Sequence, residues 1–188
     1  MIPQDNNTWR DPVMEGNPQD TSYASYMSPL VACLAASHGN VLELGMGFWS
    51  TGFLHRYCLA SGRMLFSMDS DPKWVSPFMQ YEVRGLHEVI SCHQNDYDAE
   101  LDRLSALKWG VVLLDHSPGW RRALDALNLM NNSQYLLVHD YSGDEVKQGF
   151  NAQCLAHWAH ARVATYSPTT LVLSNSVIPW WPNFEEIS

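Results

Sequence analysis

The sequence predicts an α/β fold with a doubly wound, mostly parallel sheet of seven strands that closes with a C-terminal antiparallel hairpin. Five short apolar runs are separated by segments long enough for a crossover helix, which is typical of parallel strands covered on both faces. These runs lie at residues 41–44, 64–68, 89–93, 110–115 and 135–139. The last two runs, 162–166 and 170–175, are joined by only three residues, so they suit an antiparallel hairpin and exclude a parallel crossover.

The chain has 188 residues, of which 46% are hydrophobic, and this is enough for one domain with its own core. Residues 1–21 are rich in Pro, Asn, Gln and Asp and lack periodicity, so we expect an irregular N-terminal arm. Residues 22–188 are expected to form a single domain. Within it, Ser28–Pro29 predicts the start of a helix that Gly39–Asn40 ends.

The C-terminal part of the chain departs from the strand–helix alternation. A helix is predicted over residues 144–161, just before the hairpin. The tail after the hairpin carries Trp180 and Trp181 between prolines, which favours a cover over an apolar surface. A contact between subunits is the alternative, so a homo-oligomer is left open.

The net charge bears on the partners of the protein. A formal charge of −9 and a pI near 5.2 repel polyanions, so a duplex or an acidic membrane would need a local basic patch. The densest basic group is Arg121–Arg122, which is interpreted as a solvated helix face. We therefore expect a small-molecule partner and neither nucleic acid nor membrane.

The cysteines and the N-terminus bear on the compartment. Four cysteines lie far apart in apolar surroundings and form no C-x-x-C pair, which favours reduced thiols. The N-terminal residues lack a basic region followed by an apolar one, and no apolar run approaches the length of about 20 residues that a membrane span needs. We expect a cytoplasmic protein.

A glycine loop follows the first predicted strand in "VLELGMGFWSTGFL". In an open parallel sheet, ligands bind beyond the carboxyl ends of the strands, and Gly45 and Gly47 permit a tight turn and close approach there. Ser50 and Thr51 can open the next helix, whose N–H groups are donors for a ligand. Glu43 precedes the glycines, where its carboxylate either accepts from an amine-bearing ligand or organises the loop.

Two further acids follow the second and third strands. Asp69 ends the second strand, where a carboxylate binds ribose hydroxyls in such folds. Asp96 follows the third strand and either meets an adenine edge or simply caps the next helix. Both acids are candidate cofactor-binding residues.

These features together resemble the class I S-adenosylmethionine-dependent methyltransferases, which have a Rossmann-like fold. The E-x-G-x-G element, the acids after strands two and three and the closing hairpin follow that family's order over residues 28–175. The resemblance implies that the glycine loop faces the methionine part of the cofactor, that Asp69 holds the ribose and that Asp96 lies near adenine. The sequence departs from the family at Trp49, where a third glycine is common.

A second group of acids and histidines follows the fourth and fifth strands, in "LLDHSPGWRR" and "LLVHDYSG". Asp115 and Asp140 should face the same crevice as the cofactor, with His116 and His139 beside them. Such a group predicts a metal site or an acid/base pair, and carboxylates suit Mg²⁺ whereas imidazole favours transition metals. Helix caps and loop polar groups are the alternative.

The same two segments resemble the metal-dependent O-methyltransferases of the macrolide-sugar and catechol type. "HDYS" is similar to their D-D-Y-G element, which implies that Asp115, His139 and Asp140 bind a divalent cation, Mg²⁺ or another. Ser117 stands where the sugar enzymes have an aspartate base, so the resemblance leaves His116 as its nearest replacement. The implied catalytic residues are therefore Asp115, His116, His139 and Asp140.

The leading hypothesis is thus a methyltransferase that uses S-adenosylmethionine to methylate a hydroxyl of a small molecule with divalent-metal assistance. A nicotinamide-dependent oxidoreductase is the second hypothesis, because G-x-G-x-x-S and the acid after strand two also suit a dinucleotide. A non-catalytic S-adenosylmethionine-binding accessory module is the third, because little chain is left for a substrate-capping insertion. The identity of the methyl acceptor is not encoded in these motifs.

Overall fold

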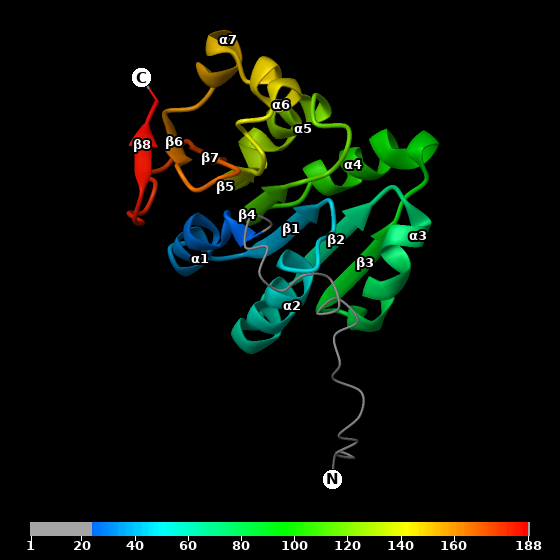
Figure 1. The fold of residues 1–188 in the computed structure, drawn as a ribbon. Coiled ribbons are helices and arrows are strands. Elements are labelled where there is room, and N and C mark those ends of the chain that lie inside the picture. The colour runs from blue at the N-terminus through cyan, green and yellow to red at the C-terminus, as the bar shows by residue number, and fades with distance from the viewer. Residues whose placement is uncertain (1–23, 188) are drawn as a thin grey trace.

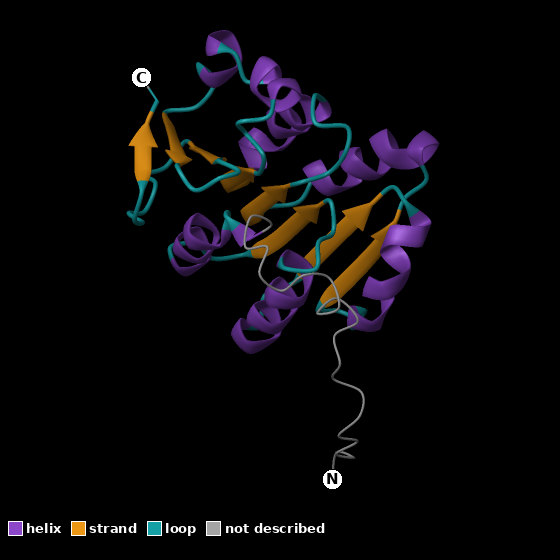
Figure 2. Cartoon of the chain, viewed as in Figure 1, coloured by secondary structure: helices purple, strands orange, loops and turns teal. Residues whose placement is uncertain are grey.

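The fold is an eight-stranded mixed sheet with helices on both faces (Figures 1 and 2). It is described for residues 24–187 of a computed structural model, so the predicted arm at 1–21 lies outside the described residues. The strands are β1 (Asn40–Leu44), β2 (Leu65–Asp69), β3 (His87–Ser91), β4 (Trp109–Leu114), β5 (Ser133–Val138), β6 (His160–Ala164), β7 (Thr170–Ser174) and β8 (Phe184–Glu186). The helices are α1 (Met27–Ala35), α2 (Ser50–Ser61), α3 (Pro72–Val75), α4 (Tyr97–Ser105), α5 (Arg121–Leu129), α6 (Asp144–Gly149) and α7 (Ala152–Leu155), with 3₁₀ turns η2 (Ser76–Tyr81), η3 (Gln94–Asp96) and η4 (Met130–Asn132).

The strand order is β3-β2-β1-β4-β5-β7-β6-β8. The first five strands pair in parallel, and β7 and β6 add to β5 as an antiparallel hairpin, which confirms the predicted doubly wound sheet and its hairpin. The prediction of seven strands is corrected to eight, because β8 pairs antiparallel with the outer edge of β6. Three residues in a polar tail carry too short a pattern to be recognised as a strand.

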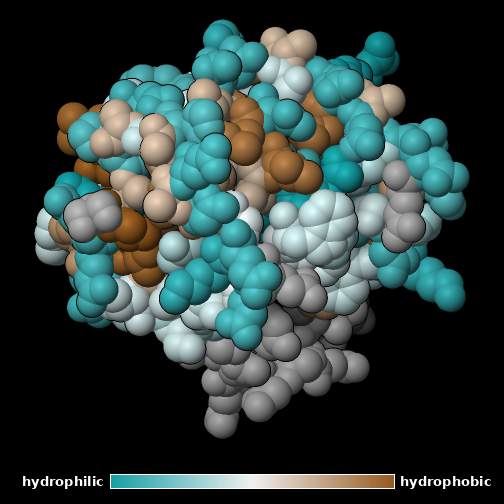
Figure 3. All heavy atoms as spheres, turned by 90° about the horizontal axis from the view of Figure 1, so that it is seen from above, coloured by the Kyte–Doolittle hydropathy of each residue, from teal (hydrophilic) through white to brown (hydrophobic). Residues whose placement is uncertain are grey.

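Two apolar layers enclose the sheet. Side chains of α1 and α2 pack on one face around Val111 and Leu113, whereas α4, α5 and α6 cover the other face around Val112 and Leu114. This alternation along β4 follows from the two-residue period of a strand, and both faces are buried because crossover helices cover them. The surface seen from above in Figure 3 is mostly polar, with smaller groups of apolar side chains.

The two helix predictions need correction. Ser28 lies inside α1, which begins at Met27 after the buried Tyr26, and no side-chain cap bond is made at this helix start. The predicted helix at 144–161 is two short helices, because α6 ends at Gly149 and the Asn151 side chain accepts from the Cys154 N–H to begin α7. The sequence pattern continues as one helix, but the Asn151 cap begins a second helix inside it.

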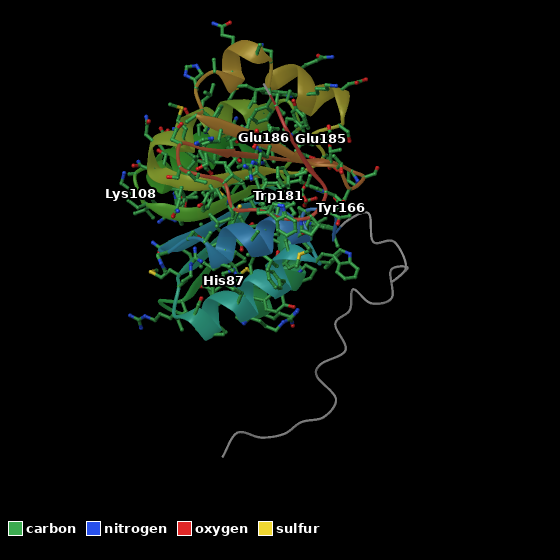
Figure 4. All side chains as sticks on the ribbon, turned by 90° about the vertical axis from the view of Figure 1, so that its left-hand side faces the viewer. His87, Lys108, Tyr166, Trp181, Glu185 and Glu186 are labelled. Atoms are coloured by element: carbon green, nitrogen blue, oxygen red, sulfur yellow. The ribbon has the colours of Figure 1, made fainter. Side chains whose placement is uncertain are left out.

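The tail after β7 covers one end of the second apolar layer. Trp181 is 1% exposed and packs in this layer with Ile178 and Phe184 (Figure 4), whereas Trp180 is 71% exposed. The tail therefore buries one tryptophan of the pair and presents the other to solvent. Within the described part of the chain, no helix combines the length and the apolar character needed to cross a membrane.

Candidate functional site

The site lies where β1 and β4 are neighbours, the point at which the strand order reverses. Gly45 follows β1 with a φ of +90°, and a Cβ there would lie 2.4 Å from the backbone carbon of Asp115 and the nitrogen of His116. Gly45 is therefore needed because the loop after β1 lies directly against the backbone after β4. The same contact brings the glycine loop beside the second predicted group of residues.

Glu43, in β1, organises the glycine loop that follows this strand. Its side chain is fully buried and accepts hydrogen bonds from the Thr51 hydroxyl at 3.0 Å and the Ser67 hydroxyl at 2.6 Å. The Thr51 oxygen in turn accepts from the Gly47 N–H at 3.1 Å. Burial raises the pKa of Glu43 to about 7, against the hydroxyl hydrogen bonds that lower it, chiefly from Ser50. Of the two roles that the sequence left open, the structure shows loop organisation, made through hydroxyl groups.

Asp69 also contacts the loop directly. Its two carboxylate oxygens accept from the backbone N–H groups of Met46 at 3.1 Å and of Asp71 at 3.0 Å. The Trp74 indole donates to the Met46 carbonyl at 2.6 Å, so the backbone of Met46 is held at both its N–H and its carbonyl. Ser50 donates to the Gly47 carbonyl at 3.3 Å. The predicted cofactor residues of the first two strand ends are thus assembled around one loop.

Asp96 lies apart from this loop at the outer edge of the sheet. It is exposed and occupies the N-cap position of α4, as the alternative predicted, but its side chain makes no cap bond. It borders an open pocket of about 290 Å³ between β3 and α4. The pocket is lined by Ile90, Ser91, Cys92, His93, Asp96, Ala99, Glu100 and Arg103.

Asp115, His139 and Asp140 converge at the ends of β4 and β5. One ligand atom from each lies within 4.8 Å of the others. His139 Nδ1 is 3.0 Å from Asp115 Oδ1 and 3.7 Å from Asp140 Oδ1. Asp140 has a φ of 53°, a left-handed conformation that non-glycine residues adopt rarely and that is enriched at functional sites. These three residues are called the carboxylate–histidine cluster below.

The cluster fits a divalent cation by its donor atoms and their spacing. Ligands at about 2.1 Å from one cation and at right angles to each other lie about 3 Å apart, close to the shorter of the two separations. Two carboxylates and one imidazole suit Mn²⁺, Fe²⁺ or Zn²⁺ better than Mg²⁺, which prefers oxygen ligands. The side chains of Asp115 and Asp140 are 22% and 45% exposed, so the cluster is accessible from solvent.

Arg122 is a site residue for which the sequence favoured a solvated helix face and left a contact with an acidic substrate open. It is 5% exposed, and its guanidinium donates to the carbonyls of His116 at 2.8 Å and His139 at 2.7 Å. The same guanidinium lies 3.3 Å from Asp115 and 3.7 Å from Asp140. The prediction of a solvated helix face is therefore wrong for Arg122. The only sequence signal was a pair of arginines opening the helix after the fourth strand.

His116 is turned away from the cluster. Its ring is 4% exposed and lies 2.9 Å from the fully buried carboxylate of Asp125, which also accepts from the Tyr97 hydroxyl and from Arg121. This separate group of side chains lies between α4 and α5. The structure thus brings Asp115, His139 and Asp140 together, but places His116 on the other side of the backbone.

Two residues just before α1 make further contacts that no sequence motif predicted. The Ser25 hydroxyl lies 3.1 Å from His139 Nε2, and the Tyr26 ring meets the His139 ring edge-on with centroids 4.8 Å apart. Burial raises the pKa of Tyr26, so its hydroxyl stays protonated. His139 is therefore held between Asp115 on one nitrogen and Ser25 on the other.

Comparisons with known proteins agree with this geometry at the level of the fold. No protein-family model matches the chain, and no curated protein matches it in sequence. An O-methyltransferase from Bacillus cereus in complex with SAH superposes with a TM-score of 0.59, at 13% identity over 80% of both chains. A TDP-rhamnose 3'-O-methyltransferase of calicheamicin biosynthesis gives 0.55, at 12% identity over 92% of this chain and 86% of the other.

A third solved structure is the plantazolicin methyltransferase in complex with a triazolic desmethylPZN analogue and SAH. It superposes with a TM-score of 0.52, at 10% identity over 84% of this chain and 87% of the other. At these identities the likeness concerns the arrangement of helices and strands. The chain has the Rossmann-like fold of the class I methyltransferases.

Proposed function

We propose that the protein is a methyltransferase that transfers a methyl group from S-adenosylmethionine to a hydroxyl of a small molecule, with a divalent cation bound by Asp115, His139 and Asp140. The observation that carries this proposal is the convergence of the carboxylate–histidine cluster with the glycine loop at the strand-order reversal. The fold and the SAH-bound solved structures support methyl transfer over the nicotinamide-dependent alternative.

The loop after β1 would bind the cofactor, which supplies the methyl group as a sulfonium. Glu43, Ser50 and Thr51 shape the loop around Gly45 and Gly47. Asp69 uses each carboxylate oxygen once for a backbone N–H, and a carboxylate has about four acceptor positions, so it can still accept from ribose hydroxyls. Asp96, at the end of β3, would lie near the adenine.

A cation in the cluster would lower the pKa of an acceptor hydroxyl. Asp115 and Asp140 provide the negative charge that binds it, and His139 provides a nitrogen ligand. Arg122 fixes the carbonyls of His116 and His139, so it holds the ends of β4 and β5 at a set separation. The methyl transfer itself then depends on alignment, which contributes about 7–11 kcal/mol in favourable cases.

Binding of the cofactor tests the first part of the proposal. Calorimetry should show binding of S-adenosylmethionine and SAH, and Asp69→Ala should weaken it by about 1–3 kcal/mol, the cost of a lost hydrogen bond to a charged group. Asp71→Ala is the matched control, because Asp71 lies two residues away, is exposed and caps α3. A wild-type protein that binds neither compound would reject the methyltransferase proposal.

Binding of Mn²⁺ tests the second part. Electron paramagnetic resonance should show a bound ion in the wild type and its loss in Asp140→Ala, with cofactor affinity nearly unchanged. Asp144→Ala, a nearby exposed acid at the start of α6, is the control. If the wild type binds no divalent ion, the contact between His139 and Asp115 supports a metal-free acid/base pair instead. Activity in excess chelator, once an acceptor is found, would support the same conclusion.

The remaining parts of the proposal concern partners and location. The net charge of −9 supports a small-molecule acceptor rather than nucleic acid. The four cysteines, all free and without a C-x-x-C pair, support a cytoplasmic location. A non-catalytic accessory module would bind the cofactor with the same residues but would transfer no methyl group to any component of a cell extract. Incubation with labelled S-adenosylmethionine and mass spectrometry of the extract separates these two outcomes and identifies the acceptor.

A further inference from the structure

A line of buried polar side chains runs from Glu43 to the surface of α2, away from the carboxylate–histidine cluster. Glu43 Oε2 accepts from the Ser67 hydroxyl at 2.6 Å, and Ser67 Oγ lies 3.1 Å from His87 Nε2. His87 Nδ1 lies 3.1 Å from His55 Nδ1. Glu43 and Ser67 are 0% exposed and His87 is 2% exposed, whereas His55 is half-buried (His87 is labelled in Figure 4).

The contacts allow two complete hydrogen-bond arrangements. When Glu43 is ionised, Ser67 donates to it, His87 Nε2–H donates to Ser67, and His55 Nδ1–H donates to His87 Nδ1. When Glu43 is protonated, it donates to Ser67, Ser67 donates to His87 Nε2, and His87 Nδ1–H donates to His55 Nδ1, so His55 carries its proton on Nε2. In both arrangements each hydroxyl and each neutral imidazole of the line donates once and accepts at most once.

One proton enters or leaves through this line when the arrangement changes. When Glu43 ionises, each member of the line passes a proton to the next one. Glu43 gives its proton to Ser67, Ser67 gives its own to His87 Nε2, and His87 gives the Nδ1 proton to His55. The proton on His55 Nε2 then passes to water. His55 is the member that solvent reaches, and His87 has to be neutral for the transfer; burial, chiefly, lowers the pKa of His87 to about 4.

The surroundings of Glu43 contain other titratable groups. Burial raises the pKa values of Tyr26 and Cys58, so both stay protonated, and the carboxylate of Asp115 acts on Glu43 from a distance. His55 is next to Arg56, which adds to the lowering of its pKa by burial, and the Tyr81 carbonyl is a further acceptor for His87. Glu43 is thus the group whose charge changes within this network.

The Thr51 hydroxyl connects Glu43 with the glycine loop. Thr51 donates to Glu43 and accepts from the Gly47 N–H. An ionised carboxylate is the stronger acceptor, so it fixes the Thr51 hydroxyl and with it the Gly47 peptide. We propose that Ser67, His87 and His55 form a proton relay that connects Glu43 with solvent, and that ionisation of Glu43 positions the glycine loop for the cofactor. The second half of this inference rests on the proposed function.

Histidine NMR without any ligand tests the relay. Long-range ¹⁵N spectra between pH 5.5 and 8.5 should show His87 changing from the Nδ1–H to the Nε2–H tautomer as the pH rises, and Glu43→Gln should abolish the change. Ser67→Ala should abolish it as well, because it keeps both histidines but removes the hydroxyl between Glu43 and His87. His157, an exposed histidine outside the line, is the internal control, because its resonances should be the same in the wild type and in Glu43→Gln at each pH. One unchanging His87 tautomer, or a change that persists in both variants, overturns the relay.

Calorimetry with S-adenosylmethionine tests the connection to the loop. In the wild type the affinity should rise severalfold between pH 6 and 8, because the ionised Glu43 fixes the loop, and Glu43→Gln should remove that part of the rise. An identical pH dependence in the variant overturns the coupling. Absence of binding at every pH would instead reject the proposed function and leave the relay to be judged by the tautomer measurement.

Discussion

The acids near the ends of β1 and β2 and the acids that follow β4 and β5 all lie at the carboxyl ends of the parallel strands, yet they serve different purposes. Glu43 and Asp69 accept hydrogen bonds from the hydroxyls and backbone N–H groups of the protein itself. Asp115 and Asp140 stay partly exposed and are balanced by a single buried cation, Arg122. An acid at a strand end is therefore a candidate ligand-binding group only to the extent that its own loop leaves acceptor positions unused.

Loss of Arg122 should have the largest effect on stability. Arg122→Ala removes a buried cation and leaves two carbonyls and two carboxylates without it, which costs about 3–5 kcal/mol for a broken buried pair. Arg103→Ala is the control, because Arg103 is 45% exposed and its ion pairs are worth about 0–1 kcal/mol. Urea unfolding of both variants makes the comparison. Equal effects would show that Arg122 does not balance the cluster.

The buried Glu43 should make stability depend on pH. Its pKa rises from 4.5 to about 7 on folding, so the unfolded chain loses this proton first and stability falls as the pH rises through that window. A shift of that size corresponds to roughly 3 kcal/mol. The free energy of unfolding of Glu43→Gln should lack this fall, because glutamine does not ionise. Relative to the wild type, the variant should therefore become more stable from pH 4.5 to 8. Parallel pH profiles in chemical denaturation would show that Glu43 is ionised at its ordinary pKa.

Gly45 tests how closely the two regions meet. Gly45→Ala places a non-glycine residue at a positive φ, which costs about 1–2 kcal/mol. The added Cβ also overlaps the Asp115–His116 backbone, which costs about 1–3 kcal/mol more. Gly62→Ala is the matched control, because Gly62 also has a positive φ, of +67°, but no atom lies within 4 Å of an added Cβ there. The difference between the two unfolding free energies isolates the overlap. A difference near zero would mean that the glycine loop can move away from β4.

Asp69, at the end of β2, and Asp140, in the loop after β5, compare the two regions most directly and should give the smallest effects. Asp69→Asn removes an acceptor from one of two backbone N–H groups and should cost about 1–3 kcal/mol. Asp140→Asn should change stability by less than about 0.5 kcal/mol, because asparagine also tolerates a positive φ and the site is exposed. Thermal unfolding without metal or cofactor is the measurement. A larger loss in Asp140→Asn would make that residue structural.

The sequence by itself determined the order of strands and helices, the hairpin and the strand ends at which Gly45, Asp69, Asp115 and Asp140 lie. It could do so because hydrophobic periodicity, turn residues and the carboxyl-end rule are local or follow from topology. The same reasoning missed β8, because that strand exists only through its pairing with the edge of β6. It also missed the break at Gly149, because the Asn151 cap that begins α7 lies inside a pattern that continues as one helix.

Only the tertiary structure decided the direction in which each polar side chain points. His116 and His139 follow adjacent strands, yet one ring faces Asp125 between the helices and the other faces Asp115. Arg121 and Arg122 are consecutive, and only the second reaches the carbonyls behind the cluster. The physical reason is that a buried polar group must form a hydrogen bond, and its partner here is a residue distant in sequence. The spacing of residues along the chain does not predict which partner that is.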